Sequence, residues 1–112
     1  MSSRGLTNFY EETIDVIKNV GKTLDDVLYV YIEGKCCKPE KFFEKIKEIE
    51  YDSGYGLQEI NSSLEIVFRN GSFLKRSEYD GSEWWSFVDV RPLDVELEEF
   101  PDDVEIKNSF EW

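Results

Sequence analysis

The pattern of apolar residues at the start of the chain predicts an amphipathic helix. Asn8 has the residue type of a helix N-cap, and Glu11 follows it at the spacing of a capping box. Gly21 marks the position where this helix is expected to stop. The residues that recur at helical spacing between these points are Tyr10, Thr13, Ile14 and Ile17.

A strand and a second helix are predicted next. The run 27–32 has the sequence VLYVYI, and its β-branched and aromatic residues are typical of a largely buried strand. Pro39 then occupies a favourable first position for a helix. The apolar stripe of this helix consists of Phe42, Ile46 and Ile49.

From Leu57 onward the pattern changes to the alternation that is typical of strands. Leu64, Ile66 and Phe68 share one face of the first such strand. Asn70 and Gly71 then predict a two-residue type I′ turn, which needs positive φ at both central residues. The pairs that follow from this turn are Phe68 with Phe73, Val67 with Leu74, and Glu65 with Arg76.

A second turn is predicted at Asp80 and Gly81, with 83–88 as the returning strand. The resulting pairs are Arg76 with Trp85, Leu74 with Phe87, and Glu78 with Glu83. Because the last pair brings two carboxylates together, we expect it either to splay toward solvent or to meet a cation from elsewhere. The segments 95–97 and 104–106 alternate briefly and predict further short strands.

These elements together predict one α+β domain that spans residues 1–112. In this fold, two helices pack on an antiparallel meander of four to six strands. A length of 112 residues suits one domain, and 40% hydrophobic residues are enough to form a core.

Charge is distributed unevenly along this chain. There are 25 acidic and 13 basic residues, which gives a formal net charge of −12. Residues 1–77 contain 13 acidic and 11 basic side chains, whereas residues 78–112 contain 12 acidic and 2 basic ones. In the portion 89–112 the acids alternate with large apolar residues. We therefore expect 89–112 to pack on the sheet, at least in part, with its carboxylates outward; a plain solvated edge is the alternative.

Composition also argues against several classes of function. With no histidine, the chain lacks Ser-His-Asp and Cys-His catalysis and imidazole metal ligands. Its two cysteines, Cys36 and Cys37, are adjacent, which suits a reducing compartment better than a disulfide scaffold. The acidic balance opposes binding to nucleic acid or anionic membranes. We expect a cytoplasmic protein that is not an enzyme and uses no cofactor or metal.

The tryptophan pair is the most specific candidate for a binding feature. On a strand, one of Trp84 and Trp85 points into the core and the other to the opposite face, although both indoles being buried is an open alternative. An exposed tryptophan would be a good interface anchor. The acids near it in sequence are Glu78, Asp80 and Glu83.

Two further groups are candidates for partner contact. The glycine-bearing segment 51–56 offers Tyr51, Asp52 and Tyr55, with a plain connection or a ligand cradle as the alternatives. The C-terminal portion offers a dense set of carboxylates: Glu96, Glu98, Glu99, Asp102 and Asp103. Such a surface steers a basic partner toward itself, and its carboxylates can replace phosphate oxygens toward Arg and Lys.

Two further segments are YDSGYGLQEI at 51–60 and EYDGSEWW at 78–85. With them, the chain resembles the immunity proteins of bacterial polymorphic-toxin systems, including contact-dependent growth inhibition. The resemblance implies a cytoplasmic inhibitor that binds a sibling's basic toxin domain, often a nuclease. A phage-type anti-restriction or anti-CRISPR inhibitor is an alternative, and so is a small-molecule-binding domain around 51–56. The sequence leaves open whether the protein is a monomer or a homodimer.

Overall fold

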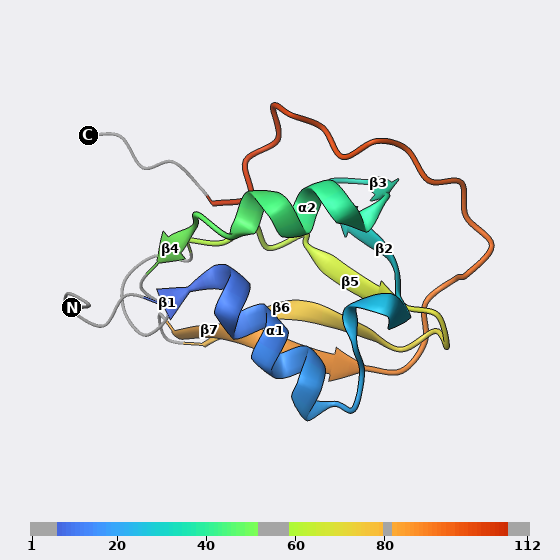
Figure 1. Ribbon diagram of the computed structural model, residues 1–112, viewed down its shortest axis with the longest axis horizontal. Coiled ribbons are helices and arrows are strands. Elements are labelled where there is room, and N and C mark those ends of the chain that lie inside the picture. Colours follow the sequence, from blue (N-terminus) through green and yellow to red (C-terminus); the bar gives the residue numbers. More distant parts are fainter. Residues whose placement is uncertain (1–6, 52–58, 80–81, 108–112) are drawn as a thin grey trace.

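Two helices lie on one face of a five-stranded antiparallel sheet (Figure 1). This computed structural model describes residues 7–51, 59–79 and 82–107. The helices are α1 (Phe9–Asn19) and α2 (Pro39–Ile46). In spatial order the strands are β3 (Lys35–Cys37), β2 (Val27–Ile32), β5 (Glu65–Phe68), β6 (Phe73–Tyr79) and β7 (Ser82–Val88). The predicted α+β fold is confirmed.

Three shorter elements connect this framework. Strand β1 (Thr7–Asn8) pairs with β4 (Glu50–Tyr51) in a small two-stranded sheet, which joins the start of α1 to the segment after α2. A short 3₁₀ helix, η1 (Leu24–Asp26), leads into β2.

The starts of both helices and the stop of α1 follow from local sequence. The backbone N–H of Glu11 donates to the Asn8 side chain at 3.0 Å, so Asn8 is the N-cap of α1 as predicted. After α1, Gly21 adopts a φ of +80°, which only glycine takes without strain. Pro39 is the first residue of α2, where its missing N–H has no cost.

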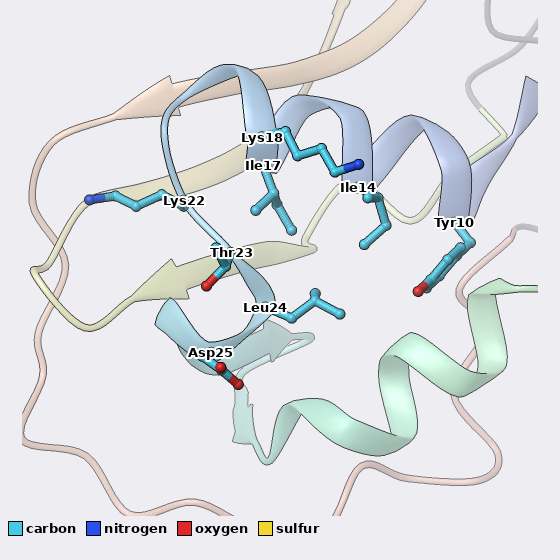
Figure 2. A pocket seen from close by; sticks show the side chains of 8 residues that line it. All are labelled: Tyr10, Ile14, Ile17, Lys18, Lys22, Thr23, Leu24 and Asp25. Carbon is cyan, nitrogen blue, oxygen red and sulfur yellow. The ribbon is translucent and has the colours of Figure 1, made fainter.

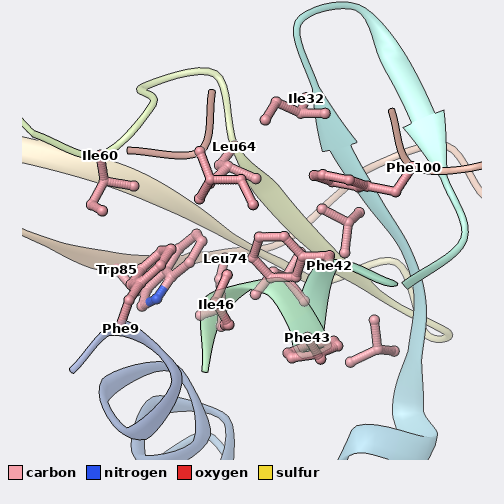
Figure 3. Packing of buried hydrophobic residues seen from close by; sticks show 14 of the residues in the cluster. Phe9, Ile32, Phe42, Phe43, Ile46, Ile60, Leu64, Leu74, Trp85 and Phe100 are labelled. Carbon is pink, nitrogen blue, oxygen red and sulfur yellow. The ribbon is translucent and has the colours of Figure 1, made fainter. Parts of the chain in front are cut away.

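The core lies between the helices and the sheet (Figure 3). Phe9 of α1 stacks on Trp85 with ring centroids 5.6 Å apart. Phe42 of α2 contacts Phe100, which the C-terminal segment inserts into the same core. Leu64, Ile66 and Phe68, which the alternation predicts on one face, are all buried in this core.

The predicted pairing of β5 with β6 is wrong by one residue. Val67 lies opposite Phe73 and Ile66 opposite Leu74. The Gly71 N–H donates to the Phe68 carbonyl, and the Phe68 N–H donates to the Ser72 carbonyl, which closes a three-residue loop. In this loop Gly71 alone has positive φ, so the turn is not type I′.

Asn70 explains the longer loop. Its side-chain oxygen accepts from the Ser72 N–H at 3.0 Å and from the Ser72 hydroxyl at 2.6 Å. These bonds favour the three-residue connection over the two-residue one. The β6–β7 register is confirmed at all three predicted pairs: Arg76 with Trp85, Leu74 with Phe87, and Glu78 with Glu83.

The C-terminal segment wraps around the β3 edge instead of adding strands. Residues 95–97 and 104–106 form no strand, so that prediction is wrong. Val95 and Leu97 instead pack against Tyr29, Val67 and Phe73 on the sheet face opposite the helices, which we call the outer face. The segment then passes the β3 edge and inserts Phe100 and Ile106 into the main core.

Candidate functional site

The structure divides the predicted binding residues among three places. Tyr51, Glu83 and Trp85 are buried. The side chains of Glu78 on β6 and Trp84 on β7 are exposed. The carboxylates of the C-terminal segment are exposed near the β3 edge. The remaining predicted residues, Asp52, Tyr55 and Asp80, lie outside the described residues.

Strand alternation separates the two tryptophans, as the sequence predicts. Trp85 is 6% exposed, and its Nε1–H donates to the Thr13 hydroxyl at 2.9 Å. Trp84 points to the outer face and is 42% exposed. Trp84 is therefore the tryptophan that can contact a partner, and Trp85 holds α1 against the sheet.

A buried charge cluster occupies the positions where a partner contact was expected. Arg76 Nη2 donates to Glu83 Oε1 at 3.2 Å and to the Tyr51 hydroxyl at 3.0 Å. Arg76 Nη1 also lies 3.7 Å from Glu12 Oε2. The guanidinium carbon is 4.8 Å from the centroid of the Trp85 ring. Arg76 and Glu83 have no exposed side-chain surface, so neither can contact a partner.

Glu83 links this cluster to a second segment of the chain. Its two carboxylate oxygens accept from the backbone N–H groups of Glu59 at 2.6 Å and Ile60 at 3.2 Å. Of the two opposed glutamates, Glu83 meets a cation, and Glu78 is exposed. The cation does not come from elsewhere in the chain but is Arg76 of the same hairpin, diagonally across the β6–β7 pair. The predicted register places Arg76 near Glu83, but only the packing of α1 over them shows that both are buried.

Burial perturbs the ionisation of two members of the cluster. The pKa of Glu12 is raised from its ordinary 4.5, mainly because burial disfavours the carboxylate. The pKa of Tyr51 is also raised, again mainly by burial, and its hydroxyl donates to Glu12 at 2.5 Å. Sequence reasoning missed Glu12 because its helix position gave no sign that β6 would bring a cation to it.

Five exposed carboxylates of the C-terminal segment form what we call the acidic belt. We use this name for Glu96, Glu98, Glu99, Asp102 and Asp103. The Glu98 backbone fixes the belt to β3, because its N–H donates to the Cys36 carbonyl and its carbonyl accepts from the Lys38 N–H, both at 2.9 Å. Phe100 anchors the middle of the belt in the core.

Hydrogen bonds also attach the start of the C-terminal segment to the sheet. The Arg91 N–H donates to the Gly71 carbonyl at 2.8 Å, and its side chain donates to Glu65 at 2.6 Å. The Tyr29 hydroxyl donates to the Pro92 carbonyl at 2.9 Å. These contacts and the apolar anchors hold the backbone that carries the belt carboxylates against the sheet.

Lysines of the α2 region neutralise part of the belt. Lys38 lies 3.3 Å from Glu99, and Asp102 is 3.1 Å from Lys41 and 3.6 Å from Lys45. The hydrogen bond from Lys41, together with its charge, lowers the pKa of Asp102. The other belt carboxylates, Glu96, Glu98 and Asp103, make no ion pair with any residue in the described ranges.

Trp84 and the belt do not form a single surface. The belt follows the β3 edge, whereas Trp84 is on β7 at the opposite edge of the sheet. Four strand spacings of about 4.8 Å place these edges roughly 19 Å apart. The chain thus has two separate candidate contact regions, one acidic and one aromatic.

A groove of about 350 Å³ lies beside α1 and η1 (Figure 2). Ile14, Ile17 and Leu24 form its apolar part, and Tyr10 closes one end. Lys18 extends along its rim, whereas Lys22 points away from it. The small-molecule site expected around 51–56 falls mostly on residues 52–56, which lie outside the described residues, so this groove does not bear on it.

Neither a metal cluster nor a membrane helix is found in the described part of the chain. Across 7–51, 59–79 and 82–107, no three Cys, Asp or Glu side chains are grouped to hold a metal ion. Neither α1 nor α2 has the length and hydropathy required to cross a bilayer. The sequence matches no family model, and neither a curated protein nor a solved structure is significantly similar to it.

Proposed function

We propose that this protein is an acidic cytoplasmic inhibitor of the immunity-protein type, which binds and neutralises a basic toxin domain. The observation that carries the proposal is the acidic belt, where Glu96, Glu98 and Asp103 are exposed and form no ion pair with the residues that the structure describes. Carboxylates of this kind form charge-assisted hydrogen bonds with Arg and Lys. A nuclease is the first candidate for the partner, because its substrate-binding surface must be basic.

The rigidity of the belt supports a binding role. Phe100 and Ile106 are buried in the core, and Val95 and Leu97 pack on the outer face. A carboxylate on an ordered backbone loses less conformational entropy when a partner binds than one on a disordered tail, because the backbone is already fixed. The belt therefore favours fast and tight association with a surface of opposite charge.

The test is inhibition of a purified basic toxin domain. The first candidate is the C-terminal domain encoded by the reading frame next to the gene for this chain, assayed for nucleic-acid cleavage with and without the protein. We expect stoichiometric inhibition that weakens as salt rises. An active basic domain that is neither bound nor inhibited at low salt would contradict the proposal.

Affinity capture from the native host separates the alternatives. Recovery of a toxin domain supports the immunity role. Recovery of a restriction or CRISPR nuclease from cells that lack a toxin gene supports an anti-restriction or anti-CRISPR inhibitor, which would use the same carboxylates. The matched bait is the Glu96→Lys/Asp103→Lys variant, which should recover neither.

A further inference from the structure

The groove beside α1 and η1, which we call the α1 groove, has the size and the lining of a small-molecule site. Its volume of about 350 Å³ lies within the range of about 300–1,000 Å³ that is typical of ligand pockets. Ile14, Ile17 and Leu24 form its apolar floor, and Leu24 is 42% exposed although it is a large apolar residue (Figure 2). A ligand with an apolar body would remove this floor from water.

One cationic side chain reaches the α1 groove without an internal partner. Lys18 follows Ile14 by four residues on α1, so both lie on the same side of the helix. Figure 2 shows Lys18 extending along the rim beside Ile14. Within the described ranges Lys18 forms no ion pair. Four other lysines each have a carboxylate within 3.6 Å: Lys38, Lys41, Lys45 and Lys47. The Lys18 ammonium is therefore available to an anion from outside the chain.

The charge of this lining differs from that of the whole chain. Lys18, Lys22 and Asp25 are the charged residues of the lining, which gives a formal charge of +1, against −12 for the chain. Asp25 lies on the far side of Leu24 from Lys18 (Figure 2). Two other acids of α1, Glu11 and Asp15, do not line the groove.

The acidic belt is too far away to oppose an anion in the α1 groove. The belt follows the β3 edge, and α2 lies between it and α1 (Figure 1). A helix with its side chains is about 10–12 Å in diameter. The Debye length is about 8 Å at 0.15 M salt, so the repulsion from the belt is largely screened at the α1 groove.

A second groove also includes Leu24 and Asp25 but extends toward α2, and we call it the α2 groove. Its volume is about 340 Å³, and Val27 and Phe43 of its lining are buried core residues. Its charged residues are Asp25, Glu40, Glu44 and Arg69, whose formal charges sum to −2. The two grooves thus have similar volumes and apolar surfaces, and charge distinguishes them. An anion favours the α1 groove, whereas a cation favours the α2 groove.

We propose that the α1 groove binds a small amphiphilic carboxylate, whose apolar chain or ring covers Ile14 and Leu24 and whose carboxylate pairs with Lys18. Charge complementarity selects this ligand, because a carboxylate accepts charge-assisted hydrogen bonds from an ammonium group. An inorganic anion would leave the apolar floor uncovered, and an uncharged molecule would leave Lys18 unpaired. This site uses no belt residue, so it goes beyond the proposed inhibition and does not depend on it.

An NMR titration with three probes of equal chain length tests the proposal. Hexanoate, hexanol and hexylamine share an apolar chain and differ in head-group charge, and each is added up to about 20 mM, enough to saturate a millimolar site. We expect hexanoate to shift the amides of 10–24 saturably. It should bind about two- to fivefold more tightly than hexanol, which is the gain that one exposed ion pair provides. Hexylamine should instead shift amides of 39–44.

Two results of this titration would overturn the proposal. One is the absence of a saturable hexanoate shift within 10–24. The other is that hexanol or hexylamine binds these residues as tightly as hexanoate, because the head-group charge would then play no part.

A matched pair of lysine variants tests the role of Lys18. Lys18→Gln removes the ammonium at an exposed position of α1 and should weaken hexanoate binding about two- to fivefold, while hexanol binding stays the same. Lys75→Gln removes the same charge at an exposed position of β6, away from the groove, and should leave both affinities unchanged. Equal hexanoate affinities for Lys18→Gln and the unmodified chain would overturn the assignment of Lys18.

Leu24→Glu tests the apolar floor. It replaces an exposed apolar side chain with a carboxylate, so it should abolish saturable hexanoate binding and weaken hexanol binding in a protein whose circular dichroism is unchanged. A folded Leu24→Glu protein that binds hexanoate normally would overturn the placement of the ligand. If this variant does not fold, the comparison of Lys18→Gln with Lys75→Gln still decides the proposal.

The belt variant separates this site from the proposed inhibition. Glu96→Lys/Asp103→Lys should bind hexanoate as the unmodified chain does, whereas Lys18→Gln should still bind a basic partner. Loss of hexanoate binding in the belt variant would contradict the separation of the two sites. Failure to inhibit a toxin domain would leave the hexanoate results standing.

Discussion

Arg76 and Glu83 form an ion pair that is fully shielded from solvent. Nη2 of Arg76 lies 3.2 Å from Oε1 of Glu83, and neither side chain has exposed surface. Aromatic rings of Phe9, Tyr51 and Trp85 surround the guanidinium, with its carbon between 4.8 and 5.6 Å from their centroids. Removing one member of such a pair leaves a buried charge without its partner.

Arg76→Met is expected to reduce the free energy of unfolding by about 3–5 kcal/mol, because Glu83 loses its buried counter-ion. Lys75→Met, at the adjacent exposed position of β6, should cost less than about 1 kcal/mol. Adding Glu83→Gln to Arg76→Met should recover part of the loss, since the amide is neutral and still accepts from the Ile60 N–H. Urea denaturation measures all three. Equal losses for Arg76→Met and Lys75→Met would contradict the structural role of the pair.

The two tryptophans are expected to respond differently to alanine substitution. Trp85→Ala should cost about 3–5 kcal/mol, because it removes a stacked core ring and the hydrogen bond to Thr13. Trp84→Ala should change the free energy of unfolding by less than about 1 kcal/mol at a concentration where the chain is monomeric. Thermal and urea unfolding give both values. Similar losses would mean that Trp84 also supports the core.

Reversing belt charges is expected to slow association with a basic partner. Glu96→Lys/Asp103→Lys should reduce the association rate constant about tenfold or more at low salt and flatten its salt dependence. The matched control is Glu11→Lys/Asp15→Lys, which alters net charge equally on exposed positions of α1. Stopped-flow or surface-based kinetics with the captured partner measure the rates. An unchanged rate for the belt variant at low salt would exclude steering by the belt.

Glu12 is expected to make stability depend on pH. Its folded-state pKa lies above the ordinary 4.5, so the folded protein binds a proton that the unfolded chain has already released. Its contribution is fully present below pH 4.5 and is lost as the pH rises through the raised pKa. The unmodified protein should therefore lose unfolding free energy relative to Glu12→Gln as the pH rises from 4.5 through the raised pKa. A difference that is independent of pH would contradict this assignment.

Local sequence signals predicted most of the framework because they act over a few residues. Asn8 and Pro39 fix helix starts through backbone geometry, and the run 27–32 becomes β2 with its predicted limits. The β5–β6 register failed because two registers give equally plausible pairs. Glu65 meets Lys75 in one and Arg76 in the other, and the Asn70 side chain selects between the loops.

The candidate site was less predictable because it depends on contacts between distant segments. Asp102 appears as an exposed carboxylate in the sequence, but Lys41 and Lys45 of α2 neutralise it in the fold. Glu83 appears as a surface acid beside Trp84, but Arg76 and α1 enclose it. No short-range pattern contains this information.

Sequence alone determined the order of α1, β2, α2, β5, β6 and β7, the opposite orientations of Trp84 and Trp85, and the concentration of acid in the last third. These properties follow from residue type, strand alternation and composition. Only the tertiary structure decided which carboxylates keep their charge available, and that the belt and Trp84 lie at opposite edges of the sheet. The physical reason is that burial and ion pairing depend on which distant segments meet, and packing of the whole chain sets those meetings.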